Sequence, residues 1–349
     1  MSEPLQVYLF DMDSVLLHPG GYRAALIAAI HHFASALGLG DVAPTLDEIE
    51  AFESLGITSE WDMAPICVAA ITLRGGRPDY RDLAHRIAEE IREKEYPAET
   101  AYRVLPRAPF TGWGVRIDEI LLHSRDIHRS SVLSIFQQYT LGKDYERTYG
   151  LPCTIDTEST ILKYDRPELT EYVPETSVIF TSRPSKPPRD VPPLPGYAPE
   201  AELGAKLLNL DYLPVVGYGH MQWLAEIVGG DADSYLKPSP IHALACISIS
   251  AMGEAFPQTD SLKAAEAASR GEWKPPLAEL RGRGGQVVVF EDSASSIVGA
   301  REAVKMLGDG WECVGVGVAS GGPKYKALVK VADRVYTSID EAVRGEVHD

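Results

Sequence analysis

Two aspartates follow directly on an apolar run near the N-terminus, in the segment VYLFDMDSVLL (residues 7–17). The residues from 5 to 11 form a nearly continuous apolar run, which is typical of a strand covered on both faces in a parallel sheet. Carboxylates are costly to bury unless something pairs with them. Asp11 and Asp13 therefore require partners from elsewhere in the chain or from a ligand.

Strand and helix patterns alternate in the second half of the chain. Short apolar runs occur in TSVIFTS, LPVVGYG, GGQVVVFEDS, ECVGVGVAS and DRVYTS, all between residues 176 and 338. Helical patterns at 220–228 and 295–308 lie between them. This alternation predicts a parallel α/β sheet, and we expect the N-terminal strand to join it.

The segment between the first strand and this sheet has a different pattern. Apolar residues at helical spacing predict helices at 22–38, 46–54, 59–73, 79–95, 115–124 and 128–141. Strand signals are scarce between 18 and about 174. We therefore expect an α/β domain over 1–17 and 175–349 with a helical domain inserted at 18–174. Within the α/β domain, the Pro-rich residues 184–199 predict an extended loop, and 254–285 look like a second added segment.

Composition excludes several classes of function. The net charge of −17 argues against a nucleic-acid-binding surface and does not favour an anionic membrane surface. The four cysteines form no CxxC pair, which argues against structural zinc and a disulfide framework. The N-terminus lacks a signal-peptide pattern, and the longest apolar stretch, IHALACISISAM, is too short to span a bilayer. We expect a cytoplasmic protein.

Four polar clusters lie at predicted strand ends or just before a helix. They are Asp11 with Asp13, Thr181 with Ser182, Lys237, and Glu291 with Asp292. Ligands of open parallel sheets bind outside the carboxyl ends of the strands. Four carboxylates in one place need a cation, and Mg²⁺ suits oxygen ligands. A lysine and a hydroxyl beside it would hold phosphate oxygens, so the set indicates phosphoryl transfer.

The same residues carry a resemblance to a known family. DMDSV, FTSR, YLKPSP and FEDSASSIVGAREA resemble, in order, the four motifs of the haloacid dehalogenase (HAD) superfamily. The last two are similar to the subfamily with a helical cap inserted after the first motif, which includes phosphoglycolate phosphatases and β-phosphoglucomutases. The resemblance covers about 1–17 and 175–340. It implies a doubly wound parallel sheet, a Rossmann-like core, with an inserted all-α cap.

The resemblance implies a role for each aspartate of the first motif. Asp11 would be the nucleophile that forms an aspartyl-phosphate. Asp13 would protonate the leaving oxygen and later activate the hydrolytic water, while its backbone carbonyl reaches the metal.

The later motifs would supply the rest of the site. Thr181 would donate a hydrogen bond to a phosphate oxygen. Lys237 would pair with Asp11 and the phosphoryl group. Glu291 and Asp292 would complete the Mg²⁺ site. Each cluster taken singly also has an ordinary structural explanation, such as a loop start, a turn lysine or charge at a helix N-terminus.

Two features depart from the family pattern. Ser14 stands where the family has a glycine. Arg183 follows Ser182 in the second motif; these two residues are candidate substrate ligands, although we favour a surface position for Arg183.

The inserted segment offers one further candidate. In GITSEWDM (residues 56–63), Ser59 and Asp62 fit a helix capping box, which is the interpretation we favour. The alternative is a substrate-facing loop that contains Thr58, Ser59, Trp61 and Asp62, of which Trp61 is the candidate substrate ligand.

Asp13 separates the chemistries found in the family. A dehalogenase does not need an acid two residues after its nucleophile, whereas a phosphatase does, because an alkoxide is a poor leaving group. The resemblance therefore implies a Mg²⁺-dependent, HAD-type phosphoric monoester hydrolase that acts on a small phosphorylated metabolite, of the phosphoglycolate or sugar phosphate class. A phosphomutase of the β-phosphoglucomutase type and a non-catalytic binding protein with the same fold remain alternatives.

Overall fold

The computed structural model describes residues 5–93, 95–106 and 116–347, and its contacts divide the chain into two compact units. The sheet unit comprises Met1–Pro19 and Asp165–Asp349, and the helical unit comprises Gly20–Tyr164. Residues 165–174, which we expected in the helical domain, belong to the sheet unit because Leu169 and Val173 pack in one of its cores. No described helix is long and apolar enough to cross a membrane.

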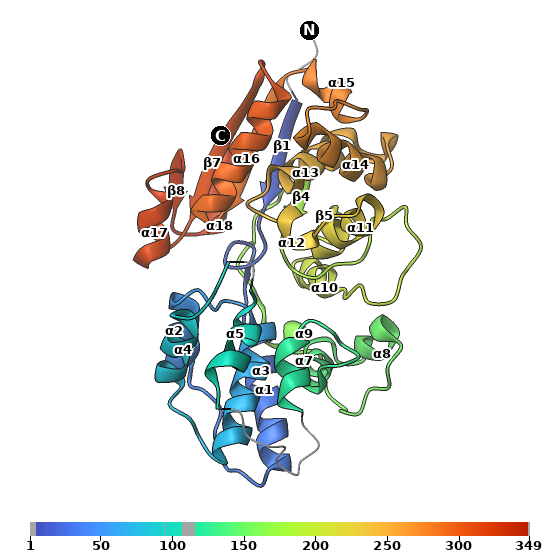
Figure 1. Cartoon of the computed structure of the whole chain (residues 1–349). Coiled ribbons are helices and arrows are strands. Elements are labelled where there is room, and N and C mark those ends of the chain that lie inside the picture. The colour runs from blue at the N-terminus through green and yellow to red at the C-terminus, as the bar shows by residue number, and fades with distance from the viewer. Residues whose placement is uncertain (1–4, 94, 107–115, 348–349) are drawn as a thin grey trace. The chain divides into compact units, whose positions relative to one another are not determined.

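The sheet unit is built on one parallel sheet. Within the described residues, six strands pair in the order β5-β4-β1-β6-β7-β8, and every pairing is parallel. The strands are β1 (Leu5–Phe10), β4 (Ser177–Phe180), β5 (Val215–Val216), β6 (Gly285–Glu291), β7 (Trp311–Val318) and β8 (Arg334–Tyr336). The predicted α/β parallel sheet is confirmed. In Figure 1 the blue strand β1 lies among the C-terminal elements, to which its pairing with β6 attaches it.

Helices cover both faces of this sheet, so it is doubly wound. Alternate residues of β1 point to opposite faces: Val7 and Leu9 belong to one core, Tyr8 and Phe10 to the other. The first core is completed by α11 (Tyr218–Val228), α13 (Pro240–Met252), α14 (Gln258–Ser269) and α16 (Ala294–Leu307), and the second by α10 (Glu200–Leu207) and α18 (Ile339–Val347).

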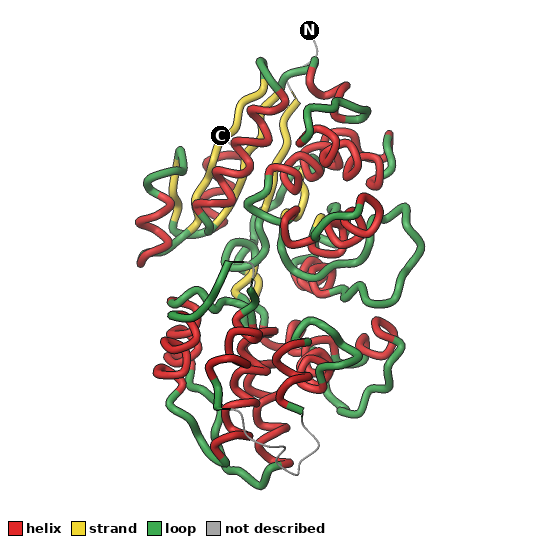
Figure 2. The backbone as a smooth tube through the Cα atoms, in the orientation of Figure 1, coloured by secondary structure: helices red, strands yellow, loops and turns green. Residues whose placement is uncertain are grey.

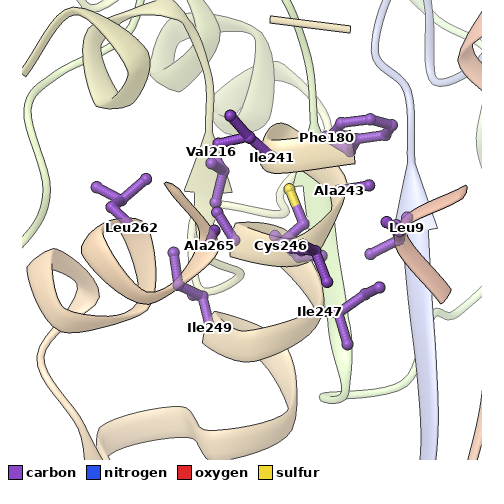
Figure 3. Close-up of a cluster of buried hydrophobic side chains, with 14 of the residues drawn as sticks. Leu9, Phe180, Val216, Ile241, Ala243, Cys246, Ile247, Ile249, Leu262 and Ala265 are labelled. Carbon is purple, nitrogen blue, oxygen red and sulfur yellow. The ribbon is translucent and has the colours of Figure 1, made fainter. Parts of the chain in front are cut away.

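Helix α13 is the buried helix predicted from the apolar stretch IHALACISISAM. It is apolar on all sides because it packs against both the sheet and α14. Figure 3 shows Ile247 on the side of Leu9, and Ile249 on the side of Leu262. The remaining elements of the sheet unit are small: β2 (Leu17–His18), β3 (Arg166–Pro167), α12 (Ala232–Tyr235), η1 (Gly253–Ala255), α15 (Leu277–Arg281) and α17 (Gly322–Leu328). The Pro-rich residues 184–199 form a loop, as predicted.

The helical unit has a core of its own, and Figure 2 shows it as helices joined by loops. Its helices are α1 (Gly21–Ala36), α2 (Leu46–Ser54), α3 (Glu60–Arg74), α4 (Tyr80–Ala88), α5 (Pro97–Val104), α6 (Ile117–Leu122), α7 (Ser131–Leu141), α8 (Asp144–Tyr149) and α9 (Thr160–Tyr164). Helix α4 is shorter than the predicted 79–95, and α6 is shorter than 115–124; positions 94 and 115 lie outside the described residues.

The capping box predicted at Ser59 and Asp62 is wrong. Ser59 is the N-cap of α3, but its side chain accepts no capping hydrogen bond. Asp62 is buried and instead accepts from Arg125 at 2.5 Å and from the N–H of Ala98 at 3.4 Å. The carboxylate of Asp62 therefore pairs with Ala98 on α5 and with Arg125, which follows α6, rather than with the start of its own helix.

Candidate active site at the carboxyl end of the sheet

Three of the predicted site residues lie at the ends of three neighbouring strands. Asp11 follows β1, Thr181 follows β4 and Glu291 ends β6. Because β4, β1 and β6 are adjacent and parallel, their carboxyl ends meet at one edge of the sheet. The backbone N–H of Asp11 donates to the carbonyl of Phe290 at 3.0 Å, so the pairing of β1 with β6 continues to the aspartate itself.

Lys237 connects these strand ends. Its Nζ lies 2.6 Å from Asp11 Oδ1, 2.7 Å from Glu291 Oε1 and 3.2 Å from the carbonyl of Phe180. The segment after Lys237 is fixed by α16, because a Cβ on Gly299 would lie 1.9 Å from the carbonyl oxygen of Pro238. Glycine at that position allows α16 to pack directly against the segment that carries the lysine.

Burial and charge act in opposite directions on this cluster. Burial raises the pKa of Asp11 to about 6, although Lys237 opposes the shift. Burial also raises the pKa of Glu291 well above its usual range, and the negative charge of Asp11 adds to this effect. Burial alone would lower the pKa of Lys237, but its ion pairs with Asp11 and Glu291 outweigh burial and raise it. The positive charge of the lysine is therefore stabilised between the side chains of Asp11 and Glu291.

Three of the predicted metal ligands converge. Oxygens of Asp11, Glu291 and Asp292 lie within 4.8 Å of one another. A set made only of carboxylates, two of them buried and the third largely buried, fits a hard divalent cation such as Mg²⁺. Lys324, which no sequence pattern singled out, forms an ion pair with Asp292 through its Nζ. Asp13, also predicted as a ligand, is not in this side-chain group among the described residues.

The side chain of Asp13 binds Arg183 instead. The guanidinium of Arg183 also forms an ion pair with Asp165, and Arg183 is only 3% exposed. The surface position that we favoured for Arg183 is therefore wrong, because two acidic side chains stabilise its charge inside the protein. Asp165 was not identified from the sequence, because it follows no predicted strand and lies within the segment expected to be helical.

The remaining candidates occupy different environments. Thr181 is buried, and its Oγ1 accepts the N–H of Arg183 at 3.2 Å. Ser182 is exposed. Trp61 lies on α3 in the helical unit, where its ring is 5.3 Å from the guanidinium carbon of Arg125.

Comparison with known proteins supports the fold but not a family. No protein-family model and no curated sequence matches the chain. A structural genomics target of the Northeast Structural Genomics Consortium is similar at a TM-score of 0.55 and 14% identity, over 99% of this chain and 98% of its own. This likeness shows a shared fold.

Two further solved structures are more distant. Phosphatase Tt82 from Thermococcus thioreducens has a TM-score of 0.46 and 16% identity, over 90% of this chain and 93% of its own. A hydrolase from Pseudomonas syringae has a TM-score of 0.31 and 15% identity, over 98% and 97%. At these scores, neither supports an inference about this chain.

Proposed function

We propose that this protein is a HAD-type, Mg²⁺-dependent phosphatase that hydrolyses a small phosphorylated metabolite. The observation that carries the proposal is the convergence of Asp11, Lys237, Glu291 and Asp292 at the carboxyl ends of neighbouring parallel strands. A buried lysine and a set of carboxylates that can hold a cation form an environment for a phosphoryl group and its nucleophile.

Asp11 is the residue to which we assign nucleophilic attack. Lys237 and the N–H of Met12 both donate to Oδ1, at 2.6 and 2.7 Å, and so fix the carboxylate. We assign attack on phosphorus to Oδ2. The P–O bond to the leaving group then breaks as the bond to Asp11 forms, and the positive charge of Lys237 stabilises the charge on the phosphoryl oxygens.

Asp13 is assigned the proton transfers. It gives a proton to the leaving oxygen in the first step and takes one from the attacking water in the second, which releases phosphate and restores Asp11. The hydroxyl of Thr181 would donate to a phosphoryl oxygen. Asp11, Glu291, Asp292 and the backbone carbonyl of Asp13 would hold Mg²⁺, which when bound neutralises charge on the transferred group.

Replacement of the nucleophile tests the proposal. We expect the wild-type protein to release phosphate from p-nitrophenyl phosphate with Mg²⁺, and Asp11→Asn to lower kcat by roughly 10⁴-fold or more while the protein stays folded. The matched control is Asp211→Asn at an exposed position of the same unit. Undiminished activity of Asp11→Asn would exclude Asp11 as the nucleophile.

A panel of phosphorylated metabolites separates the remaining alternatives. Phosphate release and isomer formation are measured in parallel on each compound. Release without isomer supports the phosphatase, isomer without release supports a phosphomutase, and binding without either product supports a non-catalytic protein.

A further inference from the structure

We propose that Arg183 is a positioning residue that holds the carboxylate of Asp13 in place, with buried Asp165 as the anchor for its guanidinium. This inference rests on the proposed function, because it concerns the residue to which we assign proton transfer. It replaces the expectation that Arg183 itself binds substrate, since the side chain of Arg183 is only 1% exposed.

The contact between Arg183 and Asp13 uses two nitrogens of the guanidinium. Nε lies 3.0 Å from Oδ1 and 2.9 Å from Oδ2, and a terminal nitrogen lies 2.5 Å from Oδ1. A planar guanidinium that contacts both oxygens fixes the rotation of the carboxylate as well as its distance, which a lysine cannot do. Asp13 therefore cannot turn away without losing several charge-assisted hydrogen bonds.

Arg183 is itself held from other directions. The terminal nitrogen that binds Asp13 also lies 2.9 Å from Asp165 Oδ2. Its backbone N–H donates to Thr181 Oγ1, and its carbonyl accepts the N–H of Tyr218 at 2.9 Å. Asp165 directly precedes β3, whose pairing with β2 fixes the backbone there.

Exposure distinguishes the three side chains. Those of Asp165 and Arg183 are 0% and 1% exposed, whereas that of Asp13 is 36% exposed. A buried ion pair is costly unless its geometry is good, and one guanidinium here serves two carboxylates. The buried side chains of Asp165 and Arg183 thus support the accessible carboxylate of Asp13. Buried neighbours of this kind fix the orientation of a reactive group.

The leaving group of the substrate distinguishes a role in proton transfer from a general structural role. p-Nitrophenolate leaves without a proton, whereas an alkoxide needs one from Asp13. We expect Arg183→Lys and Asp165→Asn to lower kcat/KM for an alkyl phosphate by roughly 10²-fold, and kcat/KM for p-nitrophenyl phosphate by less than about tenfold. The ratio kcat/KM is compared because it reports the first step, in which the leaving group departs, whereas the second step is the same for both substrates. Arg183→Lys keeps the positive charge, and Asp165→Asn keeps the shape of the side chain. Both are preferable to Arg183→Ala, which would remove the guanidinium that pairs with buried Asp165.

The matched control is Arg301→Lys. Arg301 also pairs with an aspartate in the sheet unit, Asp333 at 2.7 Å, but outside the proposed site. We expect equal, small effects on both substrates. Equal losses on both substrates in Arg183→Lys would overturn the positioning role. A gain of activity on the alkyl phosphate would overturn it too, because the ion pair would then restrain Asp13 from reaction.

A second measurement does not depend on activity. The thermal midpoints of Arg183→Lys, Asp13→Asn and the double variant form a double-mutant cycle. We expect Arg183→Lys to lower the midpoint by fewer degrees in the Asp13→Asn background than in the wild type. Additive shifts would overturn the contact, whether or not the chain is a phosphatase. Coupled shifts in a chain that hydrolyses neither substrate would instead refute the proposed function, and the role in catalysis with it.

Discussion

At the residue scale, Ser14 has a backbone conformation that normally favours glycine. Its φ of 62° lies in the left-handed region, which a side chain disfavours by about 1–2 kcal/mol. The conformation is imposed by the turn that follows β1, where the N–H of Ser14 donates to the carbonyl of Leu17 at 2.7 Å. The chain therefore keeps the glycine-type backbone and accepts local strain.

Ser14→Gly is therefore expected to stabilise the protein. Relief of the strain is partly offset by the greater freedom of glycine in the unfolded chain, so we expect a gain of at most about 1 kcal/mol in the free energy of unfolding. Urea unfolding measures it. Ser14→Ala is the control, because it removes the hydroxyl but keeps the Cβ, and it should show no gain. A loss of stability in both variants would mean that the hydroxyl, rather than the backbone, matters, and a loss in Ser14→Gly alone would contradict the strain at Ser14.

The residue types of the site were more predictable than their pairing. Asp11, Lys237 and Glu291 could be found because each lies next to a strong strand or helix pattern, and the geometry of parallel sheets brings such positions together. The buried position of Arg183 could not be found, because its partner Asp13 lies 170 positions earlier in the chain. Local patterns do not encode a contact of that range.

At the scale of elements, two buried histidines join helices to the sheet and to the Pro-rich loop. On α13, His242 accepts the N–H of Lys237 at Nδ1 and lies 3.0 Å from the carbonyl of Val216 at Nε2. On α11, His220 lies 3.4 Å from Ser185 Oγ and 3.3 Å from Gln258 Oε1. Burial lowers the pKa of His220 to about 4 and that of His242 to about 3.

These pKa values predict that the stability contributed by the two histidines falls in mild acid. An unfolded histidine binds a proton near pH 6.5, while the folded protein keeps both rings neutral, so the unfolded state binds more protons below that pH. The contribution of each ring is complete above about pH 6.5 and decreases as the pH falls towards the folded pKa. We expect a loss on the order of 2 kcal/mol per histidine between pH 7 and pH 5, measured by urea unfolding.

His220→Gln is the control for this pH dependence. Glutamine keeps hydrogen-bonding groups near Ser185 and Gln258 but does not titrate. The difference in unfolding free energy between wild type and variant should therefore shrink as the pH falls from 7 to 5. A difference that is independent of pH would contradict the assignment to His220.

Element types were more predictable than element ends. Strands β1, β4 and β6 were found because buried parallel strands are almost continuously apolar. Helix α4 ends at Ala88, short of the predicted 95, because helix ends depend on capping and packing more than on apolar spacing. Strands β2 and β3 have two residues each and carry no pattern; they exist only through their pairing with each other.

At the scale of the whole molecule, each unit buries an apolar core formed from its own residues. The core of the helical unit draws on α1 to α7, and the two cores of the sheet unit on both faces of the sheet. The sequence indicated two domains because strand signals stop after residue 18 and resume near 176. It placed the second boundary ten residues late, because residues 165–174 join the sheet unit by packing and carry no strong pattern.

Separate cores predict separate unfolding transitions, and the proposed metal site lies in only one unit. We expect calorimetry to resolve two transitions, because cooperativity within a unit depends on a shared core. Mg²⁺ at ten times its Kd should stabilise the sheet unit by about 1.4 kcal/mol and leave the transition of the helical unit in place. Asp292→Asn, which removes one of the three converging carboxylates, should abolish the Mg²⁺ shift while both transitions remain. A shift that survives in Asp292→Asn, or one that moves both transitions equally, would show that Mg²⁺ acts elsewhere than at this cluster.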